Sequence, residues 1–412
     1  MSKRSSHMKK IELLAPAGNM DKLKTALYFG ADAVYVGGKA FSLRASADNF
    51  DNAELREAVE YTHALGKKLY VTVNIFAKNK DFDKIREYCK YLRDIGVDAV
   101  IVSDPGVISL IRSEVEGLEI HLSTQANTTN SYSMRFWASQ GVARVVVARE
   151  LTLEEISQMH EQNPEVEIEA FVHGAMCISY SGRCLMSNYL THRDSNRGEC
   201  VQACRWNFRI REVTRHEDTY LEMEEDERGT YIFNSKDLNM SARIHDMVRA
   251  GVVSMKIEGR MKSEYYLATV VNAYRHAIDE YYESGEEYTL SPIVKGELEA
   301  AAHRDYTEAY ADGDNLSTVT YDNSQLDGDC IFVAKVIEGH EGYAEIEMRN
   351  RFVVGDVLEV LSPSDSFLKE IVVDRVETLE GEKIEDCKYV QQRLYLYTAI
   401  PLNAGDILRK RR

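Results

Sequence analysis

Long hydrophobic runs are absent from this 412-residue chain. No stretch approaches the roughly 18 apolar residues that a membrane-spanning helix needs. The opening segment MSKRSSHMKK also lacks the apolar core and the small-residue cleavage site of a secretory signal. We therefore expect a cytoplasmic protein without a membrane span, whose cysteines stay reduced. Residues 1–7 have the composition of a tag remnant and are left out of the fold prediction.

Several motifs that mark common enzyme classes are also missing. The chain has no H-E-x-x-H, no G-x-S-x-G and no Walker A loop, so a hydrolytic site is poorly supported. No G-x-G-x-x-G follows a predicted strand, which weakens a dinucleotide-binding fold. Proline is scarce, with six residues beside 24 glycines, and this composition argues against low-complexity linkers.

Acidic residues outnumber basic ones, and the net charge is −17. Such a chain is poorly suited to coating nucleic acid nonspecifically, because that binding depends on neutralising phosphates with cations. A local basic patch remains compatible with this charge. Two clusters qualify, each with ordinary solvated surface as the alternative: the tail 409–412, and the arginines Arg183, Arg193, Arg197 and Arg205.

One pattern recurs along the first 260 or so residues: an amphipathic stretch, a glycine and a short β-branched run. The glycine is typical of the left-handed residue after a helix, and the run is typical of a buried parallel strand. Eight strands alternating with helices predict a TIM-like (β/α)8 barrel over residues 8–285, with an open doubly wound sheet as the alternative. Five strands follow Gly30, Gly66, Gly96, Gly141 and Gly251, and three more lie at 11–18, 118–124 and 167–174.

The seventh predicted strand is followed by an insertion, residues 174–236, before the next helix. Within it, segments at 207–214, 219–224 and 230–234 predict a small antiparallel excursion. The insertion also holds a cluster of cysteines. Because loops after barrel strands meet at the carboxyl face, we expect these cysteines at the mouth of the barrel. The alternative is that they only hold a long insertion closed.

The pattern changes after the barrel. Residues 263–284 are predicted as its last helix, and residues 286–328 as a polar, irregular connector. Short alternating strands over 329–412 predict a small C-terminal antiparallel β-barrel domain. Inside this domain, FVVGDVLEV from residue 352 and LNAGDILRK from residue 402 look like weak copies of one turn-and-strand element.

Four of the seven cysteines lie within 28 residues, spaced C-x6-C-x15-C-x3-C. Disulfides are the least favoured explanation in a reducing compartment. Only the last pair has a spacing typical of structural zinc, and the whole set matches neither common ferredoxin pattern. Zinc, an iron–sulfur cluster and reduced structural cysteines therefore stay open, with His173 and His192 as spare ligands. The four are Cys177, Cys184, Cys200 and Cys204.

Polar residues follow the predicted strands, where barrel active sites form. They mix amides, hydroxyls and cations, a lining that suits an anionic, oxygen-rich ligand. Charged groups at strand ends also pair with one another structurally, and this alternative stays open. The candidates for catalysis are Arg149, Glu150, His173, Lys256, Glu258 and Arg260, accompanied by Asn74, Ser103, Asp104, Ser123, Gln125 and Asn127.

The segments LLAPAGN, EAFVHGAMCISYSGRCLMSNYL, RGECVQACRW, NSKDL and KIEGRMKSEYY together resemble the peptidase U32 family, and within it the bacterial tRNA hydroxylation proteins. The resemblance covers essentially the whole chain. It implies a 4Fe–4S cluster on Cys177, Cys184, Cys200 and Cys204, with Cys204 the least certain ligand. It further implies an oxygen-independent RNA hydroxylation factor that forms 5-hydroxyuridine at the tRNA wobble position.

The same resemblance implies partners and a co-substrate. Prephenate is the expected co-substrate, and Arg149, Lys256 and Arg260 are expected to meet its carboxylates. tRNA is the expected partner, with the arginines of the cysteine segment and the tail on its phosphates, and a second U32 family protein is a further candidate partner. Two alternatives remain: a metal-dependent, collagenase-like peptidase, as the family name implies, and a non-catalytic scaffold ordered by a cluster or zinc.

Overall fold

The computed structural model describes residues 10–43, 48–177, 179–180, 183–206, 225–226, 229–230, 235–313, 318 and 328–412. The antiparallel excursion predicted over 207–214, 219–224 and 230–234 lies almost wholly outside this range. Beside it, two short strands, β8 (Glu225–Asp226) and β9 (Gly229–Thr230), pair antiparallel. Among the described residues, no helix is both long and apolar enough to cross a membrane.

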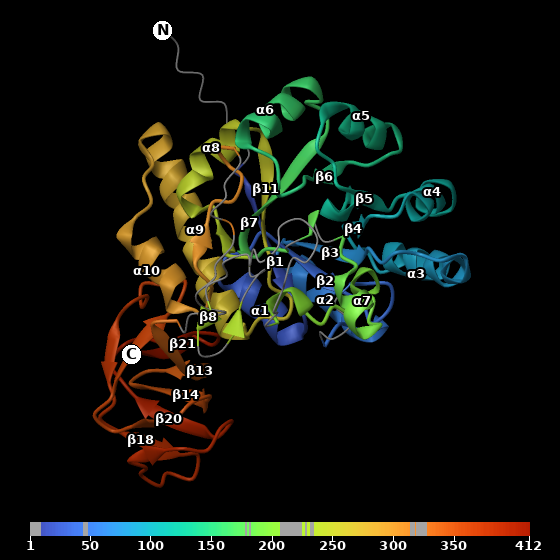
Figure 1. The fold of residues 1–412 in the computed structure, drawn as a ribbon. Coiled ribbons are helices and arrows are strands. Elements are labelled where there is room, and N and C mark those ends of the chain that lie inside the picture. Colours follow the sequence, from blue (N-terminus) through green and yellow to red (C-terminus); the bar gives the residue numbers. More distant parts are fainter. Residues whose placement is uncertain are drawn as a thin grey trace.

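Eight parallel strands form a closed barrel (Figure 1). Neighbouring strands pair in chain order from β1 to β7, and β11 pairs with both β7 and β1 to close the ring. All eight predicted strands and the TIM-like barrel are confirmed, and the open-sheet alternative is wrong. The strands are β1 (Glu12–Ala17), β2 (Ala33–Gly37), β3 (Lys68–Val73), β4 (Ala99–Val102), β5 (Glu119–Leu122), β6 (Arg144–Val146), β7 (Glu167–Ala175) and β11 (Val252–Ile257).

Helices connect these strands and cover the outside of the barrel (Figure 1). Most begin at a polar residue whose side chain accepts a backbone N–H of the first turn, as Asn19 does from Lys22. The five glycines predicted to follow helices have φ angles from +67° to +102°, as expected for left-handed C′ residues. The helices are α1 (Met20–Tyr28), α2 (Asn52–Ala64), α3 (Phe82–Asp94), α4 (Pro105–Glu114), α5 (Ser131–Ser139), α6 (Leu153–Gln162), α8 (Ile244–Arg249) and α9 (Glu264–Ser284).

The insertion after β7 contains helical turns in its cysteine segment. These are α7 (Met186–Thr191), η4 (Ser195–Arg197) and η5 (Ala203–Arg205). The chain then returns through β10 (Asp237–Asn239), which pairs antiparallel with the end of β7 and carries β12 (Tyr306–Thr307) on its other edge. The barrel sheet is thus extended beside β7 by two short strands.

The stretch predicted as an irregular connector contains a helix, α10 (Pro292–Ala300), so that prediction is wrong for these residues. Ser291 caps the helix, Pro292 occupies its first position, and Val294, Glu297 and Leu298 are buried. The polar composition hid the helix because one of its buried residues is a glutamate. Its partner lies more than 100 residues further along the chain.

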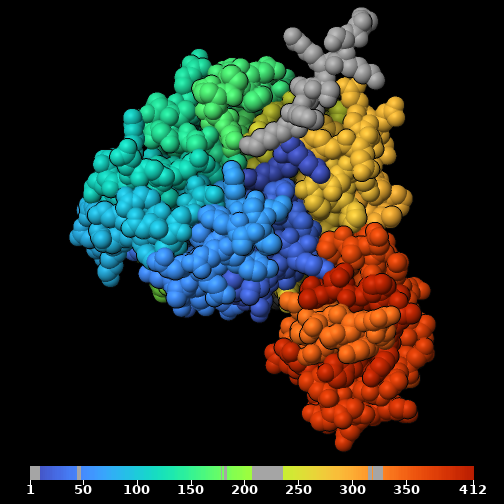
Figure 2. Space-filling model, turned by 180° about the vertical axis from the view of Figure 1, so that it is seen from behind, coloured from blue at the N-terminus to red at the C-terminus, as the bar shows by residue number. Residues whose placement is uncertain are grey.

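The C-terminal domain is a separate lobe beside the barrel (Figure 2). The predicted C-terminal antiparallel domain is confirmed. Its main sheet has seven strands, and the edge strands of that sheet, β17 and β18, do not pair with each other in the described residues. A two-stranded pair, β15 with β19, completes it. The strands are β13 (Cys330–His340), β14 (Tyr343–Met348), β15 (Phe352–Val353), β16 (Val357–Leu361), β17 (Glu370–Val372), β18 (Val376–Thr378), β19 (Asp386–Cys387), β20 (Arg393–Tyr397) and β21 (Ile407–Arg411).

The two predicted copies of a turn-and-strand element adopt the same turn. Asp356 accepts the N–H of Val353 (3.0 Å), and Asp406 accepts the N–H of Asn403 (2.8 Å). The strands that follow, β16 and β21, are neighbours in the sheet. The basic tail is therefore a central strand. The interpretation of its arginines as a nucleic-acid surface is wrong for Arg409, which is fully buried.

Candidate functional site

The cysteine segment lies over the carboxyl ends of the barrel strands, at the predicted mouth. Arg183 Nε donates to the carbonyl of Gln125 (2.7 Å), just after β5. Arg197 Nη1 donates to the carbonyl of Phe76 (2.6 Å), just after β3, and to Asp81 (3.1 Å). The Phe76 N–H in turn donates to the carbonyl of Asn196 (3.1 Å). Two strand-end loops thus hold the insertion across the mouth.

The four clustered thiols are free, partly buried and close enough to influence one another. Burial raises the pKa of Cys204, Arg205 opposes this, and the charges of the other three thiols raise it further. Backbone N–H groups approach two of the sulfurs, Met186 at Cys184 and Gln202 at Cys200, both at 3.4 Å. Such N–H···S contacts stabilise thiolate ligands in metal sites.

The ligand type of these residues suits a thiolate-bound metal, but their present spatial arrangement does not. Four thiols with amide donors suit zinc or iron–sulfur, which both prefer sulfur ligands. In the described part of the chain, however, no three His, Cys, Asp or Glu side chains stand in a metal-binding arrangement. Of the spare histidines, His173 is buried elsewhere and His192 is exposed at the end of α7. A resident metal would therefore draw the four sulfurs closer together.

Lys256 lies inside the barrel, paired with Glu169 from β7 at 2.7 Å. Both are buried, and Arg144 continues this ionic network to Glu12 and Glu167. The opposite charge of Lys256 and Arg144 holds the pKa of Glu169 below its usual range despite full burial. Because Glu169 already compensates its charge, Lys256 stabilises the interior of the barrel rather than binding an anion at the mouth.

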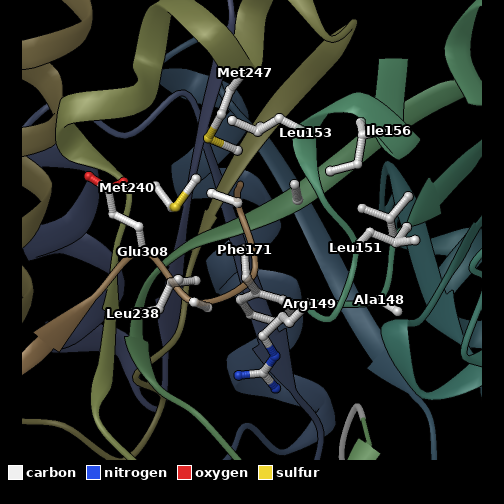
Figure 3. Close-up of a pocket in the computed structure, with 14 residues that line it drawn as sticks. Ala148, Arg149, Leu151, Leu153, Ile156, Phe171, Leu238, Met240, Met247 and Glu308 are labelled. Atoms are coloured by element: carbon white, nitrogen blue, oxygen red, sulfur yellow. The ribbon is translucent and has the colours of Figure 1, made fainter. Parts of the chain in front are cut away.

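Arg149 lies nearer the mouth. Its Nη1 donates to the carbonyl of Ala175 (3.0 Å), and its guanidinium carbon lies 4.6 Å from the ring centre of Phe171. Figure 3 shows the guanidinium pointing away from an apolar cavity of about 40 Å³ between β7, β10, α6 and α8. A cavity of this size holds about a water molecule and no substrate. Glu150, beside Arg149, is half-buried and faces Tyr180 of the insertion.

Arg260 crosses the mouth from β11 toward β2 and β3. Its Nη1 donates to the hydroxyls of Ser42 (2.8 Å) and Thr72 (2.9 Å), and its Nη2 to the carbonyl of Leu43. A Cβ at Gly37 would lie 2.1 Å from Nη1, so glycine is required there for the crossing. Arg260 is 4% exposed, and its geometry ties the loop after β2 to the barrel.

His173 is enclosed by three tyrosine rings. The ring centres of Tyr274, Tyr306 and Tyr266 lie 5.4, 5.4 and 6.1 Å away. Burial lowers the pKa of His173 to about 3, so the imidazole is neutral at physiological pH. Tyr274 donates to the carbonyl of Val172 (2.7 Å), which leaves its oxygen free to accept from His173 Nδ1 at 3.4 Å. Glu258 is half-buried nearby, and its N–H donates to the carbonyl of His173 (2.8 Å).

A charged group beside the thiols was not singled out from the sequence. Asp237 of β10 accepts Arg304 Nη1 (2.9 Å). Burial lowers the pKa of Lys262, with Arg205 adding to the effect and Asp237 opposing it. Since Arg205 also acts on Cys204, this group borders the thiols. Only the antiparallel return of β10 brings it there, and a three-residue strand has no periodicity to reveal it.

Comparisons with known proteins agree over most of the chain. The model for peptidase family U32 matches residues 18–320, and that for the peptidase family U32 C-terminal domain matches residues 329–409. A relative named tRNA hydroxylation protein P1, from Bacillus subtilis, is 42% identical over 86% of this chain and 84% of its own.

Two further relatives carry different names. The 23S rRNA 5-hydroxycytidine C2501 synthase of Escherichia coli is 30% identical over 91% of this chain and 55% of its own. A collagenase of Porphyromonas gingivalis is 31% identical over 90% of both chains. The similarity therefore spans relatives named for RNA hydroxylation and one named for proteolysis.

Proposed function

The chain belongs to peptidase family U32, and from this premise we propose that it is an RNA hydroxylation factor that works without O2 and depends on a 4Fe–4S cluster. We propose tRNA as its substrate and 5-hydroxyuridine at the wobble position as its product. Relatives named for tRNA and rRNA hydroxylation support the RNA part.

One structural observation carries the proposal. The four thiols lie over the mouth of a barrel, held there by hydrogen bonds to the loops after β3 and β5. The mouth is where barrel enzymes build their active sites. We propose Cys177, Cys184, Cys200 and Cys204 as cluster ligands, because amide donors already approach two of their sulfurs. When bound, such a cluster supplies single electrons at a tunable potential.

The chain's own residues bind and shield the reactants in this proposal. Arg149, half-exposed at the mouth, binds a carboxylate of a co-substrate such as prephenate. Arg260 holds the loop after β2 in place through Ser42 and Thr72. The insertion itself limits the access of water to the mouth. His173 stays neutral at the end of β7, where β10 pairs with this strand and Tyr274 of α9 donates to the adjacent carbonyl of Val172.

The first test is metal analysis of protein purified without oxygen. We expect about four iron and four sulfide per chain and a visible absorption that bleaches on reduction. Cys184→Ser should lose most of the iron. Cys387→Ala, which removes a buried thiol from the C-terminal domain, should keep it. Stoichiometric zinc without a chromophore would instead support a closed structural site.

The second test concerns the substrate. Deleting the gene should remove 5-hydroxyuridine-derived nucleosides from digested tRNA, as measured by mass spectrometry. Wild-type protein should restore them, whereas Cys184→Ser should not. Unchanged nucleosides in the deletion strain would contradict the proposal. The collagenase-named relative motivates one further assay, in which gelatin cleavage by the pure protein would favour a peptidase.

A further inference from the structure

Helix α7 presents apolar side chains to solvent beside the mouth. Tyr189 is 85% exposed and Leu185 is 74% exposed, although large apolar groups usually turn inward. The two are four residues apart, and the N–H of Tyr189 donates to the carbonyl of Leu185 (2.8 Å), so they share one face of the helical turn. This face has no covering element in the described part of the chain.

Exposed cations lie on both sides of α7 in the chain and in a barrel loop that contacts the insertion. Arg183 and Arg193 flank α7, and Lys78 and Lys80 lie in the loop after β3 that holds the insertion through Asp81. All four are exposed, and none of them forms a salt bridge within the described residues, although Lys80 lies close enough to Asp81 for their charges to interact. Arg183 is fixed by its bond to Gln125 and by Phe76, whose ring centre lies 5.6 Å from its guanidinium carbon.

Two carboxylates of the insertion lie close to α7 in the chain, and both accept backbone N–H groups: Glu199 accepts that of Asp194 (3.4 Å). Asp194 accepts the N–H of Asn196 (2.9 Å) and caps the turn η4. The four cations outnumber these two carboxylates, so this surface is locally basic on a chain whose net charge is −17. A second copy of so acidic a chain is a poor partner for this surface, whereas a polyanion with apolar faces is a good one. Unpaired RNA has both properties, because its bases stack on aromatic rings while its phosphates meet cations.

We propose that this surface binds an unpaired RNA loop. We name it the α7 rim and define it by Lys78, Lys80, Arg183, Leu185, Tyr189 and Arg193. Tyr189 stacks on a base, Leu185 contacts the same base or its neighbour, and the four cations meet phosphates. The inference rests on the proposed function, because it supplies the binding step for an RNA substrate. Cys184 lies between Arg183 and Leu185 in the chain, so the held loop is delivered beside the thiols.

The test compares two RNAs of equal length and charge, an anticodon stem-loop and a fully paired hairpin-free duplex. Binding to oxygen-free, metal-loaded protein is followed by fluorescence anisotropy. Tyr189→Ala should weaken stem-loop binding by about tenfold and leave duplex binding unchanged, since a stacked base contributes on that order. Tyr189→Phe keeps the ring and should bind as wild type does. Replacing Lys78, Lys80 and Arg193 by Gln should reduce the salt dependence by about 0.7 per lost contact.

The matched control is Tyr132→Ala on α5, because Tyr132 is 79% exposed and also lies beside an arginine, Arg135. Equal stem-loop binding by Tyr189→Ala and Tyr132→Ala would overturn the proposal. So would a change in self-association on Tyr189→Ala without any change in RNA binding, which would mark the rim as a contact between copies. If Tyr189→Ala alone loses the loop while gene deletion leaves tRNA nucleosides unchanged, the rim stands and the proposed hydroxylation fails.

Discussion

At the scale of single residues, the site depends on polar groups whose chemistry is altered by burial. His173 shows this most clearly, since its side chain is 1% exposed and enclosed by tyrosines. An imidazole in that setting is neutral in the folded protein, with a pKa of about 3, and becomes protonated near pH 6.5 once the chain unfolds. Its burial therefore links the stability of the β7 end to pH.

The sign of this link follows from proton uptake. Between the two pKa values the unfolded chain binds the proton and the folded chain does not, so stability falls as pH falls. We expect His173 to contribute a loss of roughly 1.4 kcal/mol between about pH 7.5 and pH 5.5. Urea unfolding of His173→Gln should show a pH dependence smaller by that amount. His192→Gln, at an exposed position, should retain the wild-type slope, and an equal change in both variants would contradict the assignment.

At the scale of elements, the described residues 183–206 of the insertion are held on the barrel mainly by polar contacts rather than by an apolar core. Among the described residues 183–206, Ala203 has the only buried apolar side chain. Arg183 and Arg197 instead donate hydrogen bonds to backbone carbonyls of two strand-end loops. Segments with few buried apolar contacts open at lower free energy than the sheet they cover. The insertion is thus an element that can open without unfolding the barrel.

Arg197→Ala tests this attachment. It removes the contacts with Phe76 and Asp81, and charge-assisted bonds of this kind are worth about 1.5–3 kcal/mol each. Amides of residues 185–206 should therefore exchange with deuterium about tenfold faster or more, while those of β1 to β4 keep their protection. Arg193→Ala removes an exposed arginine whose side chain contacts no barrel residue among those described, and it should leave exchange unchanged.

At the scale of the whole molecule, the barrel and the C-terminal domain are joined by buried charge. Arg409 of β21 is fully buried and bridges Glu297 of α10, at 2.9 Å, and Glu359 of β16, at 2.7 Å. Tyr28 of α1 donates to Asp406 (2.8 Å) at the same junction. Burying an unpaired charge is strongly unfavourable in free energy. These ion pairs and hydrogen bonds therefore make the docking of the two domains specific.

Arg409→Met keeps the volume and removes the charge, which leaves Glu297 buried without its cation. We expect a loss of about 3–5 kcal/mol from the stability of the joined domains, measured by urea unfolding and by proteolysis at the domain junction. Glu359 keeps Arg411 as a partner, at 2.9 Å. The double variant Arg409→Met with Glu297→Gln should therefore recover part of the loss. Arg411→Met, at a half-exposed pair, should cost less than about 1 kcal/mol.

The local pattern of the chain was enough to predict most of the architecture. Glycine after an amphipathic helix and a β-branched run are signals contained within about ten residues. Five of the eight barrel strands were predicted from them, and short apolar runs predicted the other three. The position of the cysteines followed from the order of the predicted strands, because an insertion after a barrel strand has to emerge at the mouth. The repeated turn in the C-terminal domain was also visible, since the aspartate that forms each turn lies three residues from its partner.

The local pattern could not predict which charged side chains form ion pairs with one another. Lys256 and Glu169 are 87 residues apart, and Arg409 and Glu297 are 112 apart. Which of them meet depends on strand register and domain docking, which no local signal records. The barrel, the insertion and the clustering of the thiols could be predicted from the amino-acid sequence, because these features depend on short-range periodicity and spacing. Strand register and domain docking, which exist only in the folded chain, settle which cations are buried in ion pairs and which, on the α7 rim, remain exposed to solvent.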